Sequence, residues 1–473
     1  MIEGLRPYPS MKDSHSAFLG EVPEHWDLRR MRTLARGPIR NGVGESAQPY
    51  RVDWPRYIRI TDIAGPRQLK QSTRASLPHA FKALAPVEHG ELFLAAVGAT
   101  YGKSYLHNAT FGDACYAGYL VRWSPSAEVI PEWASYWTES SAYWGQVNSG
   151  VIKSTIENFS ATRFRGLRVA LPPPREQAAM VRFLDYVDRR IRRYIRAKQK
   201  LIKLLEEQKQ AIIHKAVTRG LDPNVRLKPS GMEWLGEIPE HWDLVPNRAL
   251  LRLEKRLVGG AWSKYPLLSL TKRGVILRDL VNPEGKFPTS FEAYQEVKPG
   301  DLVFCLFDID ETPRAVGLST LHGMITGAYT RFLCDASVVD WVHLFYLAMD
   351  NGKRLKPLYT GLRKVITKSS FLSAKMPLPP ASERAEIMEF VQGLLITGDE
   401  ASGRARVEIA LLNEFRTSLI ADVVTGKLDV REAAAWLPAE VEEPETLDEV
   451  DEGLDAVEAA DDALDDVLEG VEA

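Results

Sequence analysis

The chain contains two copies of one framework, and this repeat constrains the fold more than any other feature. The segment GEVPEHWDL at residues 20–28 returns 216 residues later as GEIPEHWDL at residues 236–244. A second pair, at an offset of 207, matches Leu171-Pro172-Pro173 with Leu378-Pro379-Pro380 and continues by matching Leu204-Leu205 with Leu411-Leu412. An internal repeat predicts two copies of one structural unit. The residues between the repeated segments share few identities, so the framework is repeated, whereas the sequence between its segments, which we call the filling, is not.

The filling of each copy combines strand and helix patterns. Short β-rich runs at residues 92–97, 119–123 and 301–306 stand beside Gly or Pro, which is typical of strands. Stretches with helical character, residues 132–143 and 341–349, lie between them. We therefore predict an α+β globular domain in each copy.

A long helix is expected after each Pro-rich turn. Apolar residues recur at alternating steps of four and three in both segments, which is the pattern of a coiled-coil seam. From Glu176 to Val217 a helix would measure roughly 60 Å at 1.5 Å per residue, far more than one small domain needs. The first seam has breaks at Lys198 and Gln208, and Gly398 and Gly403 weaken the second helix. The seam residues are Met180, Leu184, Val187, Ile191, Tyr194, Leu201, Leu205 and Ile212, then Ile387, Val391, Leu394, Ala401, Ala405, Leu412, Phe415 and Leu419.

The charges of the two helices are complementary. Residues 176–217 carry eleven basic and five acidic groups, whereas residues 383–423 carry four basic and eight acidic groups. Opposite net charge favours the helices lying against each other, although each exposed ion pair contributes little and the pattern also suits partner helices. We expect an antiparallel pair with an internal pseudo-twofold repeat, because the intervening block must bring the chain back. The expected order is an N-terminal segment (1–13), domain 1 (14–173), spacer helix 1 (174–220), domain 2 (221–381), spacer helix 2 (382–430) and an acidic tail (431–473) that we expect to be disordered.

Composition separates the tail from the body of the chain. Residues 437–473 hold sixteen Asp or Glu and no Lys or Arg, so the net charge of −3 conceals a body with 60 basic and 47 acidic residues. A body at +13 suits a polyanionic partner, although solvated lysines on any large protein would give the same balance. The first twenty residues contain no apolar run suited to a signal peptide, no later stretch is expected to span a bilayer, and the three cysteines are far apart. We expect a cytoplasmic protein that contacts no membrane and carries free thiols.

The motifs that could carry catalysis are incomplete. Residues 98–104, GATYGKS, have three residues between the glycines where a phosphate-binding loop needs four. The acidic run 308–311, DIDE, has no second carboxylate strand and is better interpreted as a loop. His25 and His241 occupy equivalent places in the two copies without repeated catalytic partners, so we expect them to pack beside Trp26 and Trp242. We predict no catalytic centre and no bound metal or cofactor.

Together, WLGEIPEHW at residues 234–242, its variant at 18–26, LPPPREQ at 171–177 and GDLVF at 300–304 resemble the specificity subunits of type I restriction–modification systems. The likeness runs from residue 14 to about 430 and leaves out the acidic tail. It implies a non-catalytic subunit whose two target-recognition domains each read half of a split site in double-stranded DNA, with the helices as spacers. It also implies two docked methyltransferase (modification) subunits and further restriction/translocase subunits, which would supply S-adenosylmethionine, ATP and Mg.

Candidate residues follow from the polar turns and from the helix surface. Because phosphate contacts give affinity and base-edge contacts give discrimination, basic groups in loops are the first candidates, with an ordinary solvated surface as the alternative. Apolar residues beside the first seam are candidates for partner docking. A protein-binding coiled-coil scaffold and a recognition domain fused to an enzyme are the competing hypotheses. The DNA-binding candidates are Lys103, Lys153, Ser154, Lys272, Arg273, Arg314, Arg363, Lys364 and Lys368, and the docking candidates are Ile195, Ile202 and Leu204.

Overall fold

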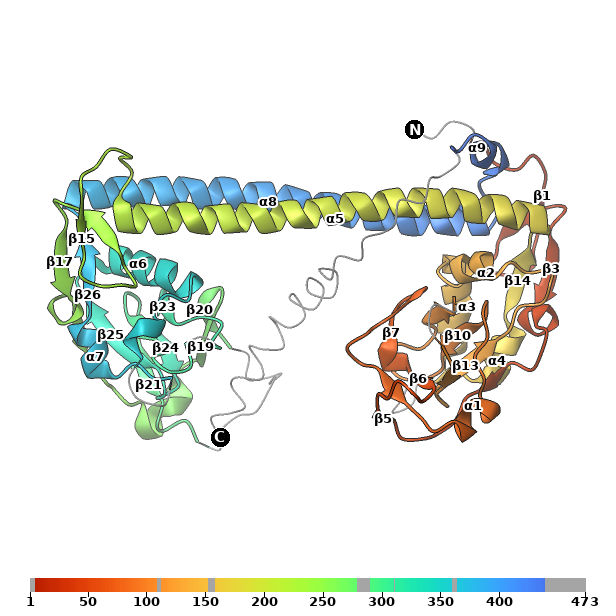
Figure 1. Ribbon diagram of the computed structural model, residues 1–473, viewed down its shortest axis with the longest axis horizontal. Helices are drawn as coiled ribbons and strands as arrows, with labels where there is room; N and C mark the ends of the chain where they lie inside the picture. The colour runs from red at the N-terminus through yellow and green to blue at the C-terminus, as the bar shows by residue number, and fades with distance from the viewer. Residues whose placement is uncertain are drawn as a thin grey trace. The chain divides into compact units, whose positions relative to one another are not determined.

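The computed structural model describes residues 5–108, 112–151, 158–278, 290–309, 311–359 and 364–438 (Figure 1). It divides into two compact units. Of the described residues, unit 1 combines those up to Gln199 with residues 406–438, and unit 2 is formed by those in Lys200–Ala405. Two long helices, α5 (Pro174–Arg219) and α8 (Ala381–Val424), each contribute one end to each unit. Each unit therefore contains one globular block and one end of the helix pair.

A four-stranded antiparallel sheet forms the centre of the block in unit 1. Its middle strand is fully buried because an unbroken apolar run, residues 92–95, faces the core on both sides. Leu92 pairs with Leu106 on one side and with Trp123 on the other. In order across the sheet, the strands are β11 (Ser104–Leu106), β10 (Leu92–Ala95), β13 (Leu120–Trp123) and β4 (Arg40–Asn41).

Unit 2 repeats this sheet with the same order and pairing. Leu302 pairs with Leu318 and with Phe332, as Leu92 does with its two neighbours. The strands are β23 (Val316–Leu318), β22 (Leu302–Phe304), β25 (Thr330–Cys334) and β18 (Leu251–Leu253). The predicted α+β repeat is confirmed, and it extends into the blocks, where few identities remain.

Smaller sheets complete each block. In unit 1, β12 (Ala114–Tyr116) pairs in parallel with β6 (Arg56–Ile58), which is followed by β9 (Ala75–Ser76) and β5 (Gln48–Pro49), while β7 (Ile63–Gly65) pairs with β8 (Gln68–Leu69). In unit 2 the additional pairs are β19 (Leu268–Thr271) with β20 (Gly274–Leu277), and β21 (Gln295–Val297) with β24 (Gly323–Ile325).

The repeated GE[VI]PEHWDL segment forms two strands at the joint between block and helix. In unit 1 they are β2 (Glu21–Pro23), which pairs with β1 (Met11–Asp13), and β3 (Asp27–Arg30), which pairs with β14 (Arg168–Leu171). In unit 2 they are β16 (Glu237–Pro239) with β15 (Leu227–Pro229), and β17 (Asp243–Pro246) with β26 (Lys375–Leu378).

Short helices cover the sheets. The helix expected over residues 132–143 is two helices, because Ser140 caps the second by accepting a hydrogen bond from the backbone N–H of Tyr143. The α-helices of unit 1 are α1 (Ala80–Leu84), α2 (Pro131–Trp137), α3 (Ser141–Gly150), α4 (Ala161–Gly166) and α9 (Arg431–Ala435), and those of unit 2 are α6 (Val339–Asn351) and α7 (Lys368–Ser373).

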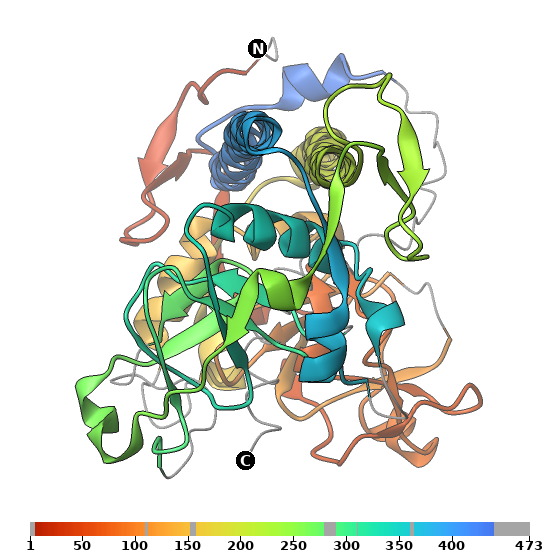
Figure 2. The ribbon, with the colours of Figure 1, turned by 90° about the vertical axis from the view of Figure 1, so that its left-hand side faces the viewer.

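The ends of α5 and α8 lie side by side and antiparallel in each unit, as predicted (Figures 1 and 2). In unit 1, Arg416 of α8 forms ion pairs with Asp188 of α5 and with Glu139, the latter at 2.9 Å. In unit 2, the ammonium of Lys209 lies 3.0 Å from the Asp399 carboxylate. The basic helix therefore meets the acidic one through specific pairs within each unit.

The seam of α5 differs from the prediction after Ile191. Tyr194 and Leu201, which we assigned to the seam, are 62% and 44% exposed, so this part of the prediction is wrong. Ile195, Lys198 and Ile202 are half-buried instead, because the seam advances by four residues from Ile191 and not by three. Such a step compensates for the drift of an α-helix against a strict seven-residue repeat.

The seam of α8 also contains polar and small residues. Phe415, assigned to the seam, is 51% exposed, whereas the neighbouring Arg416 is half-buried. Ser402 is buried at a position where we expected Ala401. Gly398 does not break α8. A Cβ there would lie 3.3 Å from Cδ of Lys209, so the missing side chain makes room for the lysine stem.

The first residues of the segment assigned to the tail are folded onto unit 1. The helix α9 buries Ala433 and Ala434 in the core of that unit, next to Val430. Arg182 of α5 donates a hydrogen bond to the carbonyl of Leu437 at 2.8 Å. The expected disorder therefore does not apply to residues 431–438, and residues 439–473 lie outside the described part of the chain.

Candidate nucleic-acid interface

Each block has a hairpin at an equivalent place in its four-stranded sheet, and most of the described DNA-binding candidates lie on or near these hairpins. The hairpins join β10 to β11 in unit 1 and β22 to β23 in unit 2. In both units a later segment pairs with a residue just after the first strand of the hairpin. Asn158 pairs with Val97 in unit 1, and Val365 pairs with Phe307 in unit 2. The two units therefore share the backbone arrangement of this hairpin but differ in the side chains that it carries.

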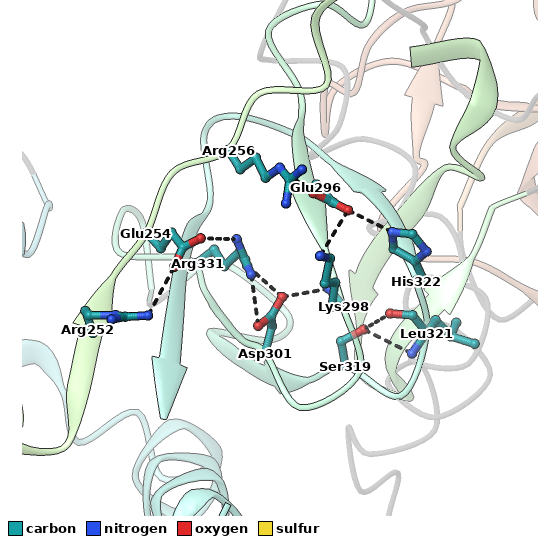
Figure 3. Close-up of polar contacts among 10 residues, drawn as sticks. All are labelled: Arg252, Glu254, Arg256, Glu296, Lys298, Asp301, Ser319, Leu321, His322 and Arg331. Atoms are coloured by element: carbon teal, nitrogen blue, oxygen red, sulfur yellow. Dashed lines mark hydrogen bonds and ion pairs between the residues drawn. The ribbon is translucent and has the colours of Figure 1, made fainter. Parts of the chain in front are cut away.

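A buried ion pair anchors the hairpin of unit 2 (Figure 3). Asp301 accepts hydrogen bonds from Nε and Nη2 of Arg331, at 2.6 and 3.2 Å, and from the backbone N–H of Lys298 at 2.6 Å. The side chains of Asp301 and Arg331 are 5% and 4% exposed. Removing either partner would leave a buried charge without its main counter-charge, which strongly destabilises a fold.

The same pair occurs in unit 1 with looser geometry. Glu91 occupies the place of Asp301, and Arg122 lies at 3.7 Å from it on the adjacent strand. The carboxylate of Glu91 also accepts hydrogen bonds from the Ser124 hydroxyl at 2.5 Å and from the backbone N–H of Glu88 at 2.9 Å. The sequence signal for this role was the Gly-(Asp/Glu) pair directly before each central strand.

A second carboxylate in Figure 3, that of Glu296, is surrounded by exposed cationic side chains of unit 2. Glu296 is almost buried and lies 2.9 Å from Arg256, 3.0 Å from His322 and 3.6 Å from Lys298, whose side chains are about half exposed. Burial disfavours the ionised carboxylate of Glu296. The hydrogen bond to His322 and the charges of Arg256 and Lys298 outweigh that penalty and hold its pKa below the usual value. Sequence reasoning missed this cluster because its members are scattered along the chain.

The structure brings together three of the predicted residues at the β22–β23 hairpin. Arg314 donates hydrogen bonds to the side-chain oxygen of Asn351 at 2.5 Å and to the Lys272 carbonyl at 3.4 Å, and its side chain is 14% exposed. Lys364 lies 2.5 Å from the Glu311 carboxylate. Arg314 therefore ties the turn after β19 to the hairpin, and its guanidinium is largely used within the protein.

The hairpin of unit 1 carries Lys103 at the end of a tight turn. The turn is closed by the backbone N–H of Gly102, which donates to the carbonyl of Ala95 at 2.8 Å. Gly102 has a φ of +80° and lies against Trp144 and Val147, so a side chain there would be strained and would clash. Lys103 is exposed beside it. This geometry suits a phosphate contact.

An exposed patch of arginines on aromatic rings lies elsewhere on unit 1 and was not predicted. The Arg51 guanidinium lies 4.5 Å from the ring centre of Trp54, and that of Arg74 lies 5.4 Å from the ring of Tyr50. Tyr50 is 42% exposed. The segment YRVDW at residues 50–54 interleaves basic and aromatic residues, which is a pattern that sequence reasoning could have used.

The remaining DNA-binding candidates are dispersed or lie outside the described residues. Arg273 is exposed in the turn between β19 and β20, beside Lys272, and Lys368 is exposed at the first position of α7. Lys153, Ser154 and Arg363 lie outside the described residues.

The docking candidates on α5 have unequal exposure. Ile195 packs against the core of unit 1, and Ile202 is half-buried. Leu204 is 50% exposed, and its repeat equivalent on α8, Leu411, is 58% exposed. Val407 and Phe415 of unit 1 are similarly exposed, so an apolar stripe follows the outer surface of α8 at steps of four residues.

The repeated histidines connect the blocks to the helices. His25 and Trp26 both form hydrogen bonds with the Glu176 carboxylate at the start of α5, at 2.7 and 3.0 Å. Their equivalents in unit 2, His241 and Trp242, form the same bonds with Glu383 at 2.8 and 3.0 Å. This repeated contact has a structural explanation that requires no catalysis.

The part of the chain that the structure describes contains no group of three or more His, Cys, Asp or Glu side chains placed to hold a metal ion. Of the acidic run considered above, Asp308 and Glu311 are described, and Glu311 is paired with Lys364. Among the described helices, none is long and apolar enough to cross a membrane.

Comparison with known proteins identifies a curated relative that matches nearly the whole chain. The putative type I restriction enzyme MjaX specificity subunit of Methanocaldococcus jannaschii is 21% identical over 431 residues, which cover 87% of this chain and 96% of that protein. The chain is a homologue of this type I specificity subunit. No family model matches it.

Solved structures include the same fold. A chain from a study of complex assembly and conformational transition in a type I R-M system superposes with a TM-score of 0.60 at 14% identity, covering 85% of this chain and 98% of that one. The HsdS subunit from Thermoanaerobacter tengcongensis matches 86% of this chain and 98% of its own length, with a TM-score of 0.46 at 14% identity. The match with a TM-score of 0.60 shows that this chain shares the fold of a type I R-M protein.

Proposed function

We propose that this chain is the non-catalytic DNA-specificity subunit of a type I restriction–modification complex. Each unit reads one half of a bipartite site in double-stranded DNA. The observation that carries the proposal is the contrast within the repeat. The buried anchors Asp301–Arg331 and Glu91–Arg122 recur, whereas the hairpins they support differ. Unit 1 presents the exposed Lys103, and in unit 2 the enclosed Arg314 ties the hairpin to the turn that carries the exposed Lys272.

Such a contrast suits recognition of two different half-sites. A rigid framework fixes the position of each block on the DNA, and variable polar side chains on the hairpins contact phosphates and base edges. The Arg51–Trp54 and Arg74–Tyr50 patch of unit 1 and the Glu296 cluster of unit 2 add exposed cations for the phosphate backbone. The similar protein of Methanocaldococcus jannaschii is named as a specificity subunit, which agrees with this role.

Partner subunits complete the proposed complex. Two methyltransferase subunits would dock on the exposed apolar residues of the helices, including Leu204 and Leu411, and restriction/translocase subunits would join them. Those partners would bring S-adenosylmethionine, ATP and Mg, and this chain would bind none of the three. The complex would act in the cytoplasm, where it meets DNA.

The decisive experiment selects duplexes from a random library with the chain co-expressed with its methyltransferase partner. The expected product is a split site with two constant halves and a fixed spacer. Exchanging residues 90–124 for the equivalent block of a homologue with another target should change one half and leave the other unchanged. Binding with no sequence preference would favour a coiled-coil scaffold instead, and none of the comparisons supports that scaffold.

A further inference from the structure

The turn at residues 51–54 of unit 1 displays an apolar side chain in solvent. It joins β5 to β6, and the backbone N–H of Trp54 closes it by donating to the Arg51 carbonyl at 3.2 Å. Val52 is 89% exposed, more than any other large apolar side chain among the described residues, and Asp53 beside it is exposed too. β5 and β6 lie on the side of the block away from α5 (Figure 1). The helix therefore leaves the tip of the turn uncovered.

Hydrogen bonds tie this turn to the sheet of the block. The hydroxyl of Ser76, which is buried on β9, accepts from the backbone N–H of Arg51 at 3.0 Å and donates to the Arg51 carbonyl at 3.2 Å. The ring of His79 donates to the carbonyl of Asp53 at 2.7 Å. A single exposed valine is ordinary on a protein surface, but one held in place contacts a partner without the entropy cost of ordering a loop. The tip is therefore preorganised for binding.

Two guanidinium groups beside the turn are open to an anion. Arg51 lies over the ring of Trp54 and Arg74 over the ring of Tyr50, and both arginines are exposed. Among the described residues, neither arginine forms an ion pair with a carboxylate. Stacking on a ring face leaves the N–H groups at the edge of a guanidinium free to donate. The turn therefore combines an apolar tip with two cations that suit the phosphates of DNA.

This part of the backbone differs between the two copies. The parallel pairing made by Tyr57 recurs in unit 2 at Leu267. Five residues before these positions, unit 1 has Val52 in a tight turn, whereas unit 2 has Trp262 inside the 3-10 helix η4 (Gly259–Lys264). A residue that supports the repeated framework would be expected in both copies. The turn therefore belongs to the variable filling, as expected of residues that distinguish one half-site from the other.

The two residues at the tip match two groups in the major groove of DNA. The 5-methyl of thymine is the apolar group there, and the amino group of cytosine donates to a carboxylate. Val52 supplies a stiff, branched apolar side chain. Asp53 supplies an acceptor, which phosphates beside Arg51 and Arg74 would repel unless a donor on a base faced it. Contact with bases therefore explains both tip residues, whereas contact with phosphates alone explains neither.

We propose that Val52 and Asp53 read bases in the half-site of unit 1. Val52 contacts the 5-methyl of a thymine, and Asp53 accepts a hydrogen bond from the amino group of a neighbouring cytosine. Arg51 and Arg74 hold nearby phosphates and carry no base preference. This inference rests on the proposed function and adds a second reading surface to the β10–β11 hairpin.

The first measurement uses the co-expressed complex and the duplex that it selects. Exchange of residues 90–124 identifies the half-site that belongs to unit 1. Each thymine of that half is then replaced by deoxyuridine, which lacks only the 5-methyl group. At one thymine the unaltered complex should lose about fourfold in affinity, as burial of one methyl group implies. The variant Val52→Ala should bind the thymine and uracil duplexes equally.

The matched control is Leu84→Ala, because Leu84 is an exposed apolar residue of unit 1 on α1. This variant should keep the fourfold difference between thymine and uracil. A second measurement repeats the selection with Asp53→Asn. An asparagine pairs with adenine, so the preference for cytosine next to the thymine should shift towards adenine by at least about fivefold. Circular dichroism checks that every variant is folded.

Three results would overturn the inference and leave the proposed function intact. They are a unit 1 half-site without thymine, a half-site in which no thymine is sensitive to loss of its methyl, and a Val52→Ala variant that keeps the full difference between thymine and uracil. The last result would place the turn on the sugar–phosphate backbone. Selection of no split site by the unaltered complex would instead overturn the proposed function, and this inference with it.

Discussion

The carboxylate of Glu176 accepts a hydrogen bond from the indole nitrogen of Trp26 at 3.0 Å, and the framework repeats this contact between Glu383 and Trp242. The two copies are not equal. Glu176 also accepts from the hydroxyl of Tyr8 at 3.1 Å and pairs with Arg431 at 3.2 Å, and its side chain is 8% exposed compared with 26% for Glu383. In unit 1, Glu176 therefore has four partners: His25, Trp26, Tyr8 and Arg431. Of these, Tyr8 belongs to the N-terminal segment.

Changing Glu176 to Ala should destabilise unit 1 more than Glu383 to Ala destabilises unit 2. The first change leaves buried donors on Trp26 and Tyr8 without an acceptor, and each unsatisfied group costs about 1–3 kcal/mol. Hydrogen exchange of backbone amides, followed by mass spectrometry, should show faster exchange at β2 and α9 in the first variant. Comparable acceleration in the two variants would contradict the difference in burial.

The ion pair Asp301–Arg331 allows a second test, because removing one partner and replacing both partners should have different effects on the stability of unit 2. The single change Asp301→Asn should destabilise unit 2 by about 3–5 kcal/mol, since it leaves the Arg331 charge buried. The double change Asp301→Leu with Arg331→Met should recover much of that loss. Urea unfolding followed by exchange protection of β22 and β25 measures both variants. A double variant no more stable than the single one would mean that the charges themselves stabilise the fold.

Acid should destabilise both blocks through two histidines, the buried His107 and the half-buried His343. Burial, followed by the charges of His89 and Arg56, lowers the pKa of His107 to about 4, and burial with Arg314 does the same for His343. An unfolded histidine titrates near 6.5, so it takes up a proton that the folded one resists. The stability contribution is full above pH 6.5 and is lost progressively as pH falls to about 4.

His107→Gln should flatten this pH dependence in unit 1, and His343→Gln should do so in unit 2. Melting temperatures between pH 7 and pH 4.5 provide the measurement, with exchange protection used to assign each transition. His15, which is exposed, supplies the matched control, and His15→Gln should leave the profile as it was. A profile unaltered by both test variants would show that other groups cause acid sensitivity.

The exposed patch on unit 1 leads to a prediction about salt. Arg51→Gln and Arg74→Gln should each weaken binding of the target duplex and reduce the slope of log affinity against log salt by about 1, because each loses one phosphate contact. Sequence preference should stay constant. Fluorescence anisotropy between 50 and 200 mM salt measures the slope. Arg29→Gln is the control, because Arg29 lies at the joint with β14.

The sequence predicts the repeated framework well because local patterns encode it. Two α+β blocks, the antiparallel helices and the joint residues His25 and His241 all follow from the repeated motif and the apolar spacing. The seam was predicted less well, because apolar Tyr194 fits a step of three, whereas the structure selects Ile195 and buries the stem of Lys198, whose ammonium pairs with Glu408 at 2.6 Å. The four-residue step compensates for helix drift, which the alternating pattern of fours and threes did not include.

Prediction of the candidate site from the sequence was limited in the same way. Turn composition correctly indicates Lys103 and Lys272 as exposed, but it does not reveal that Arg314 is enclosed by Asn351, 37 residues away. The cluster around Glu296 joins residues from three segments that have no common local pattern. Pairing across strands creates such sites, and a single sequence carries no direct signal for it.

The exposure of Leu204 and Leu411 leads to a prediction about stoichiometry. The two leucines are repeat equivalents, 50% and 58% exposed, and neither lies in the seam. Leu204→Asp should therefore remove one methyltransferase subunit from the complex and Leu411→Asp the other, because a buried, unpaired carboxylate in an interface is costly. The double variant should retain neither subunit, while each block stays folded. Native mass spectrometry of the co-expressed complex counts the subunits.

Leu84→Asp is the matched control, since Leu84 is 61% exposed on α1 and outside both helices, and it should leave two subunits bound. Ile195→Asp should act differently, because the half-buried Ile195 side chain packs against the core of unit 1. Its loss should destabilise the helix pair of that unit before it affects docking. A complex that keeps two subunits in the Leu204 and Leu411 double variant would place the docking surface elsewhere, with the stripe of Val407 and Phe415 as the next surface to alter.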